Sequence, residues 1–225
     1  MTYKTVLPGS FLSRPNRFIA QVKINGEVCV CHVKNTGRCR ELLVPGAEVY
    51  VEKSENPARK TLYDLIAVRK GELLINMDSQ APNKAAAEAL HRLLPELILL
   101  RAEQKFGNSR FDFYAETGQN EKWFLEVKGV TLEENGVVRF PDAPTERGTK
   151  HLRELCRCVE QGYRACALFV IQMKGPRYFE PNAVTDPEFA KALRFAASHG
   201  VQLLAYDCLV SPNSMVLDEA VEIRL

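Results

Sequence analysis

Apolar and polar residues alternate over short stretches in the first 80 residues of the chain, with turn residues between the stretches. The alternation defines five stretches, at residues 17–24, 27–33, 48–53, 62–69 and 72–76. The pair Asn25-Gly26 separates the first two, and Asn-Gly between apolar stretches is a strong β-hairpin signal. Alternation with a period of two is typical of strands with one buried face. Five short strands without a long helix predict a small β-barrel.

After a polar linker at residues 77–83 the pattern becomes mixed. Residues 84–94 are rich in Ala and Leu and predict a helix with Asn83 as its N-cap. The later elements that we expect are strands at 97–105, 110–116 and 123–132, a helix at 145–161, a strand at 164–172, a helix from 186 to about 200 and a strand at 201–206. This order predicts a mixed α/β (α+β) sheet covered by helices. We therefore divide the chain into domains at 1–80 and 81–225.

Basic residues gather in the front part of a chain whose net charge is only +2. Residues 1–80 hold 12 Lys and Arg against 8 Asp and Glu. Arg14, Arg17, Arg38 and Arg40 are the candidates for binding phosphate, and Phe18 is either a stacking platform for a base or, the favoured interpretation, a core residue. An oligonucleotide-binding (OB) barrel is the natural candidate for such a domain. A solvated basic face without a partner is the alternative.

Seven cysteines and no apolar N-terminal segment favour reduced thiols in the cytoplasm. No apolar stretch approaches the roughly 20 residues that span a bilayer, so we expect no membrane association. Cys29, Cys31, His32 and Cys39 lie close together in sequence but match no common zinc spacing. We therefore favour buried thiols over a zinc site.

The triplet Glu126-Val127-Lys128 is the part of the sequence that indicates chemistry. On a strand, Glu126 and Lys128 project to one face while Leu125 and Val127 pack inward. Asp112 lies between Phe111 and Phe113 one strand earlier; the two rings are expected to share a face, with Asp112 on the other. If these strands pair, Asp112 and Glu126 converge. Two carboxylates suit Mg²⁺ or Mn²⁺, and Lys128 can then activate a water. A cross-strand ion pair is the plain alternative, and Glu103-Gln104-Lys105 is a second E-x-K triplet.

A polar stripe on the predicted helix at 145–161 strengthens this interpretation. Arg147, Lys150, His151 and Glu154 follow one another at i, i+3, i+4 and i+7. Three cationic side chains beside the carboxylates could hold a scissile phosphate, although an ordinary exposed helix face has the same pattern. Glu88, on the helix before, is a candidate third metal-binding carboxylate, or else an exposed helix residue.

Several stretches resemble the sugar fermentation stimulation protein A (SfsA) family. They are Asn16-Arg-Phe18, Asn35-Thr-Gly37, Ser109-Arg-Phe-Asp-Phe113, Phe124-Leu-Glu-Val-Lys-Gly-Val-Thr-Leu132 and Phe140-Pro-Asp-Ala-Pro-Thr-Glu-Arg-Gly-Thr-Lys-His-Leu-Arg-Glu-Leu155. The resemblance implies an OB-like barrel followed by a restriction-endonuclease-like domain of the PD-(D/E)xK type. It also implies DNA binding with little sequence preference in prokaryotic cytoplasm, and a link to sugar use.

Carried over residue by residue, the resemblance assigns Asp112, Glu126 and Lys128 to the metal and water-activating positions and Glu88 to the first-helix acid. Asn35 and Thr36 of the matching Asn-Thr-Gly stretch join the candidates for DNA binding. Phe111 stands where the PD motif has proline. Two hypotheses follow: a Mg²⁺-dependent nuclease, or a non-catalytic DNA-binding regulator of sugar metabolism genes. A metabolite enzyme ranks last, because no G-x-G-x-x-G or Walker motif occurs. The oligomeric state stays open, a homodimer included.

Overall fold

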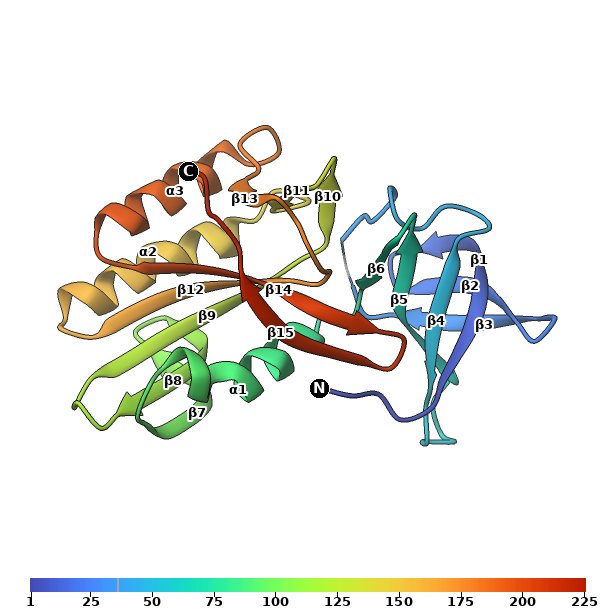
Figure 1. Ribbon diagram of the computed structural model, residues 1–225, viewed down its shortest axis with the longest axis horizontal. Coiled ribbons are helices and arrows are strands. Elements are labelled where there is room, and N and C mark those ends of the chain that lie inside the picture. Colours follow the sequence, from blue (N-terminus) through green and yellow to red (C-terminus); the bar gives the residue numbers. More distant parts are fainter. Residues whose placement is uncertain (36) are drawn as a thin grey trace.

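The computed structural model describes residues 1–35 and 37–225 and shows two domains, a barrel and a layered sheet (Figure 1). The barrel strands are β1 (Val6–Asn16), β2 (Ile19–Ile24), β3 (Glu27–Val33), β4 (Glu48–Lys53), β5 (Tyr63–Lys70) and β6 (Leu73–Asn76). They are ordered β3-β2-β1-β4-β5-β6, and a parallel pairing of β3 with β5 closes five of them into a barrel. The predicted OB-like barrel is therefore confirmed.

The β2–β3 hairpin forms at the predicted turn. Asn25 and Gly26 have φ values of 50° and 90°, the pair of positive angles that a two-residue turn requires. Strand β1 was not predicted, because Pro8, Gly9 and Pro15 interrupt its pattern and proline and glycine are rare within strands. Gly9 is needed where β1 crosses the barrel, since a Cβ there would lie 2.6 Å from Val22.

The back domain contains three helices and two sheets among the described residues. Its elements are α1 (Ala81–Leu93), β7 (Leu97–Phe106), β8 (Ser109–Thr117), β9 (Lys122–Val130), β10 (Leu132–Glu134), β11 (Val137–Phe140), α2 (Glu146–Glu160), β12 (Arg164–Ile171), β13 (Tyr178–Pro181), α3 (Pro187–Ser198), β14 (Gln202–Ser211) and β15 (Ser214–Ala220). The large sheet has the order β15-β14-β12-β9-β8-β7, with β9, β12 and β14 parallel. This is the mixed sheet that the sequence predicts.

Helices cover both faces of the large sheet (Figure 1). One apolar cluster joins α1 to β9, β12 and β14, and includes Leu90, Leu125 and Leu168. The other joins α2 and α3 to the opposite face and includes Leu152 and Phe169. Burial on both faces explains why β12 is a continuous apolar run.

Three details of the back domain differ from the sequence prediction. Helix α1 begins at Ala81 with Gln80 as the N-cap, so Asn83 is not the cap. The short sheet β10-β11-β13 and the last strand β15 were not expected. Strands β10, β11 and β13 have only three or four residues, which are too few positions for a period of two to be recognised.

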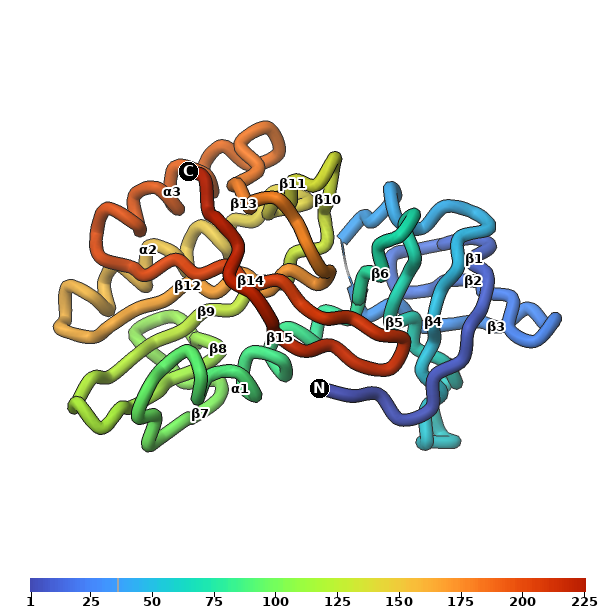
Figure 2. Tube along the Cα trace, viewed as in Figure 1, coloured from blue at the N-terminus to red at the C-terminus, as the bar shows by residue number. Residues whose placement is uncertain are grey.

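The two domains meet through the segment that connects them and through the first residues of the chain. The tube in Figure 2 shows the N-terminal end lying beside β15, where Thr2 forms a bridge with Ser214. Polar side chains hold the connecting segment on both sides: Nζ of Lys34 in the barrel lies 3.1 Å from the buried carboxylate of Asp78. Gln172 of the back domain donates to the backbone of Asn76 and Asp78. Over residues 1–35 and 37–225, no helix is long and apolar enough to cross a membrane.

Candidate active site and basic loop

Asp112 lies where strands β8 and β9 separate. The two strands pair from Glu116 opposite Lys122 as far as Phe113 opposite Leu125. Beyond that point, Oδ2 of Asp112 accepts a hydrogen bond of 2.7 Å from the backbone amide of Val127. The Asp112 carboxylate thus binds the backbone amide of the residue that follows Glu126. This hydrogen bond brings the two acidic residues close together on the sheet.

The prediction that Phe111 and Phe113 share a face is wrong. Phe111 packs against Phe124 and His151 on the α2 side, whereas Phe113 lies in the cluster beneath α1. On β7, Glu103 lies between the partners of these two rings and has a φ of 55°. Such an angle is rare for a residue other than glycine and breaks the regular alternation of the strand. Phe111 and Phe113 therefore lie on opposite faces of the large sheet.

Glu126 is buried at the centre of the site. Its Oε1 accepts hydrogen bonds from Nζ of Lys128 at 2.6 Å and from Nδ1 of His151 at 2.5 Å. Because a carboxylate can only accept, Nδ1 of His151 carries the proton. The other oxygen, Oε2, is buried and has no hydrogen-bond partner among the described residues. A buried carboxylate oxygen without a donor is costly, so its presence indicates a site for a positively charged ligand.

The two carboxyl groups have pKa values shifted in opposite directions. Burial and the charge of Glu126 raise the pKa of Asp112 above its usual range. Burial alone would also raise the pKa of Glu126, but the hydrogen bond from His151 and the charge of Lys128 more than offset it and leave the pKa lowered. Two titratable groups driven apart by their surroundings are typical of functional sites.

Asn83 is a member of the site that the sequence did not indicate. It lies in the first turn of α1 and donates through Nδ2 to Oδ1 of Asp112 over 2.8 Å. Glu88, the candidate third carboxylate, is not brought to this pair. Its side chain is 61% exposed and binds the amine of Met1 at 2.5 Å. Helix α1 therefore presents an amide, not a carboxylate, to Asp112.

Helix α2 positions His151 against the sheet. Thr145 caps the helix by accepting from the amide of Gly148 at 3.0 Å. His151 and Glu154 are buried, whereas Arg147 and Lys150 are exposed. The predicted polar stripe is therefore divided between the protein interior and the surface. Its exposed members, Arg147 and Lys150, can contact an anion in solution. The exposed ammonium of Lys150 lies 3.3 Å from the backbone oxygen of Asn108.

The basic residues of the barrel divide into a structural and an exposed group. The guanidinium of Arg14 donates to four backbone oxygens, those of Arg17, Asn35, Gly37 and Arg38, at 2.7–2.9 Å. These bonds leave Arg14 little capacity for phosphate, so its assignment to DNA binding is better replaced by a role in holding the loop. Asn35 also stabilises the loop, since its Oδ1 accepts from Gly37 at 2.8 Å. Thr36, a further candidate, lies outside the described residues.

Arg17, Arg38 and Arg40 are exposed around a shallow cavity of about 380 Å³. Phe18 beside them is 45% exposed, and the guanidinium carbon of Arg17 lies 4.9 Å from its ring centre. The favoured interpretation of Phe18 as a core residue is therefore wrong. An exposed ring among three exposed arginines has the composition of a surface that binds single-stranded nucleic acid.

The cysteines near the loop do not form a cation site with His32 among the described residues. Cys31 and Cys39 are buried, and burial raises the pKa of both thiols to about 12. Nδ1 of His32 instead lies 3.2 Å from Oδ1 of Asp64.

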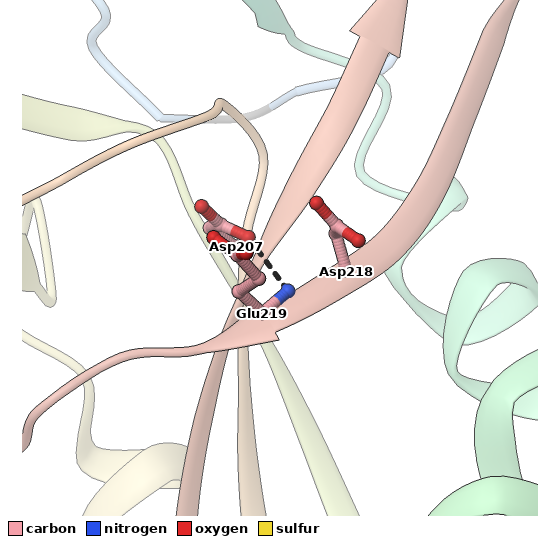
Figure 3. Close-up of side chains that lie close together, drawn as sticks. All are labelled: Asp207, Asp218 and Glu219. Atoms are coloured by element: carbon pink, nitrogen blue, oxygen red, sulfur yellow. Dashed lines mark hydrogen bonds between the residues drawn. The ribbon is translucent and has the colours of Figure 1, made fainter.

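In the described part of the chain, one group of three acidic side chains has its oxygens close enough together to hold a metal ion. This group lies apart from Asp112 and Glu126. Asp207 of β14 and Asp218 and Glu219 of β15 point toward one another (Figure 3). The ammonium of Lys174 lies 2.7–3.1 Å from all three carboxylates. Hydrogen bonds to Asp218 and Glu219 raise the pKa of Lys174, so this cluster already has its cation.

The donor set at Asp112 and Glu126 fits a small divalent cation. Both side chains offer the hard oxygen ligands that Mg²⁺ and Mn²⁺ prefer, and Oε2 of Glu126 is a buried acceptor with no partner among the described residues. Such ions keep several waters, so two protein carboxylates are sufficient.

The fold and this geometry define a class: an OB barrel joined to a restriction-endonuclease-like domain with an Asp…Glu-x-Lys site. Family models match both parts, the SfsA N-terminal OB domain at residues 12–77 and the sugar fermentation stimulation protein RE domain at residues 80–214. The chain belongs to the sugar fermentation stimulation protein (SfsA) family.

Relatives cover the whole chain. A sugar fermentation stimulation protein homolog of Clostridium beijerinckii is 54% identical over 227 residues, with all of both chains covered. A homolog of Desulfitobacterium hafniense is 56% identical over 226 residues, covering 100% of this chain and 99% of its own. The solved structure of Pyrococcus furiosus SfsA in complex with Ca²⁺ has a TM-score of 0.89 at 26% identity, and the match covers 100% and 98% of the two chains.

Proposed function

We propose that the protein binds DNA, with little sequence preference, and hydrolyses its phosphodiester bonds with the help of Mg²⁺ or Mn²⁺ in the cytoplasm. The observation that carries the proposal is the buried Oε2 of Glu126, which has no partner among the described residues and lies in a site shared with Asp112, Lys128 and His151. The large majority of buried polar atoms have a hydrogen-bond partner, so a buried carboxylate oxygen without one calls for an explanation.

Asp112 and Glu126 would hold the cation. When bound, it would offset the negative charge that develops on the phosphate and on the leaving oxygen. Asn83 and the Val127 amide hold the two oxygens of Asp112, so this carboxylate is fixed before any ligand arrives.

Lys128 and His151 keep Glu126 ionised and oriented by binding its Oε1. Lys128 is 15% exposed and lies beside the carboxylates, where its ammonium can orient and polarise an attacking water. Arg147 and Lys150, exposed on the outer half of the α2 stripe, are placed to bind the phosphate backbone.

The barrel supplies affinity. Arg17, Arg38 and Arg40 neutralise phosphates, and Phe18 stacks on a base. The Pyrococcus furiosus relative was solved as a complex with Ca²⁺, which supports a site for a hard divalent cation in this family.

The test is a cleavage assay on single- and double-stranded DNA, with Mg²⁺, Mn²⁺ or a chelator. Glu126→Gln and Lys128→Ala are expected to lower the rate by about a hundredfold or more, the size of effect seen when one electrostatic group is removed from an active site. The chain offers matched controls in its second E-x-K triplet, where Glu103 and Lys105 are exposed on β7. Glu103→Gln and Lys105→Ala should leave the rate unchanged.

Binding is measured on the same samples by fluorescence anisotropy. Metal-dependent cleavage that is lost in the site variants and kept in the controls supports the nuclease. DNA binding without cleavage under every condition would instead leave a non-catalytic DNA-binding regulator on a nuclease-like fold. Cleavage that survives Glu126→Gln would mean a contaminating nuclease or another site, and would contradict the proposal.

A further inference from the structure

A small pocket lies at the junction of the two domains, beside the proposed active site. Its volume is about 170 Å³, and its wall includes Asn35 and Gly37 of the barrel loop and Gly129, Phe140, Asp142 and Gln172 of the back domain. Gly129 directly follows Lys128 on β9. The pocket is smaller than the roughly 300–1,000 Å³ that accommodate drug-sized ligands, so it suits a small planar group.

Gln172 presents a fixed acceptor to this pocket. Its side chain is buried, and its Nε2 donates to the backbone oxygen and Oδ1 of Asn76 and to the backbone oxygen of Asp78, at 3.0–3.2 Å. Three acceptors around the nitrogen settle the orientation of the amide. Oε1 then faces Gly129, where a Cβ would lie only 2.5 Å from it. No donor among the described residues reaches this oxygen.

Asp142 adds a charged acceptor at the other side. It forms no ion pair or hydrogen bond within residues 1–35 and 37–225, and its Oδ2 lies so close to Gly37 that a Cβ there would be 2.2 Å away. Phe140 supplies an apolar wall whose ring is held by Phe169 and Phe189. The pocket therefore combines an apolar side with two acceptors and with Arg139, whose guanidinium binds Glu134 and Glu180, and both glycines keep it open.

We infer that this pocket receives one unstacked nucleobase of the bound DNA, adjacent to the phosphate at Asp112 and Glu126. The inference rests on the proposed function. Oε1 of Gln172 and the carboxylate of Asp142 accept N–H donors, which the exocyclic amino groups of adenine, cytosine and guanine supply. Arg139 in the same wall can meet a ring acceptor of that base.

The experiment uses the full chain with Ca²⁺ and fluorescein-labelled single-stranded oligonucleotides in which 2-aminopurine is moved one position at a time. The fluorescence of 2-aminopurine rises when the base leaves its stack. Anisotropy of the fluorescein reports binding of the same DNA separately. We expect a strong rise at one position, and an affinity about tenfold higher for a base than for an abasic nucleotide there, equivalent to one or two hydrogen bonds to a charged group.

Asp142→Asn is the diagnostic variant, because it keeps the shape of the side chain and removes the charge. It should reduce the tenfold preference to about twofold and leave the affinity for abasic DNA unchanged. Glu160→Gln, an exposed acid at the end of α2 outside the pocket, is the control. Equal binding of normal and abasic DNA, or a rise that Asp142→Asn does not alter, overturns the pocket while DNA binding stands. Unchanged anisotropy with every oligonucleotide overturns the proposed function itself.

Discussion

Nδ1 of His151, on α2, donates to Oε1 of Glu126, on β9, over 2.5 Å, and this bond joins the helix layer to the sheet at the candidate active site. Both side chains are about 95% buried. The His151 ring also meets Phe111 edge-on, with 5.9 Å between the ring centres. A buried carboxylate that stays ionised needs such a donor, since burial alone favours its protonated form.

Replacing His151 by alanine should therefore lower both stability and cleavage. Among the residues that the structure describes, the variant leaves Glu126 with Lys128 as its one remaining donor. The loss of a hydrogen bond to a charged group costs about 1–3 kcal/mol. Urea unfolding measures the change, with Arg153→Ala on the exposed side of the same helix as the control. Equal stability of both variants would show that the His151 bond contributes nothing to the fold.

Substitution should divide the arginines of the barrel into one group that affects stability and another that affects DNA binding. Arg14→Ala removes bonds to four backbone oxygens and should destabilise the protein by about 1–3 kcal/mol. Arg38→Ala and Arg40→Ala should change stability by less than about 0.5 kcal/mol, because both residues are exposed. Each of these two should instead weaken DNA binding and reduce the slope of log affinity against log salt by about 1. Thermal unfolding and salt titrations by anisotropy measure the two effects, and a reversed pattern would contradict the division.

Patterns of neighbouring residues were sufficient to predict the features of the fold that depend on local interactions alone. The hairpin turn at Asn25 and Gly26 depends on neighbouring residues and formed as predicted, and helix α2 (Glu146–Glu160) lies within the predicted range 145–161. The convergence of Asp112 with Glu126 was also foreseeable, because the hairpin between their strands is short and fixes the pairing.

Other features depend on contacts between distant residues and leave no local signal. Asn83 looks like a helix cap in the sequence, but its amide binds Asp112, 29 residues later. Glu88 has the type and position of a metal ligand, yet the Met1 amine binds it. Phe111 and Phe113 lie on opposite faces although they are two residues apart, and the opposite strand has a positive φ at Glu103; no rule of alternation includes either feature. The pocket at Gln172 requires both domains and could not be seen from either alone.

Asp64 should make stability depend on pH in the acidic range. Burial raises the pKa of this carboxyl, but hydrogen bonds from Arg59 and the charge of Lys34 more than offset it and lower the pKa below its usual range. A folded-state pKa below the unfolded value of about 4 gives stabilisation that is complete above that pH and lost as the pH falls through the folded-state pKa. Asp64→Asn should thus be less stable than wild type by about 1–3 kcal/mol at pH 7 and nearly equal to it near pH 2.

The measurement is urea unfolding of both proteins between pH 2 and pH 8. Glu72→Gln is the control, an exposed acid with no ion pair among the described residues. A difference between Asp64→Asn and wild type that stays constant over this range would mean that the side chain acts by packing and not by its charge.

Lys174 should act as a built-in cation for Asp207, Asp218 and Glu219. Without the ammonium, three carboxylates within 4.8 Å of one another would repel, and Asp207 is buried with only 3% of its side chain exposed. Lys174→Gln should therefore lower the melting temperature, and the loss should shrink at high salt, which screens the repulsion. Millimolar Ca²⁺ should raise the melting temperature of Lys174→Gln more than that of wild type. Without the ammonium, the carboxylates of Asp207, Asp218 and Glu219 offer the oxygen ligands that Ca²⁺ prefers.

The matched control is Lys191→Gln, which removes an exposed ion pair with Glu188. If Ca²⁺ shifted Lys174→Gln and wild type by the same amount, the cluster would not be a cation site in either protein, and the Ca²⁺ effect would have to arise at Asp112 and Glu126.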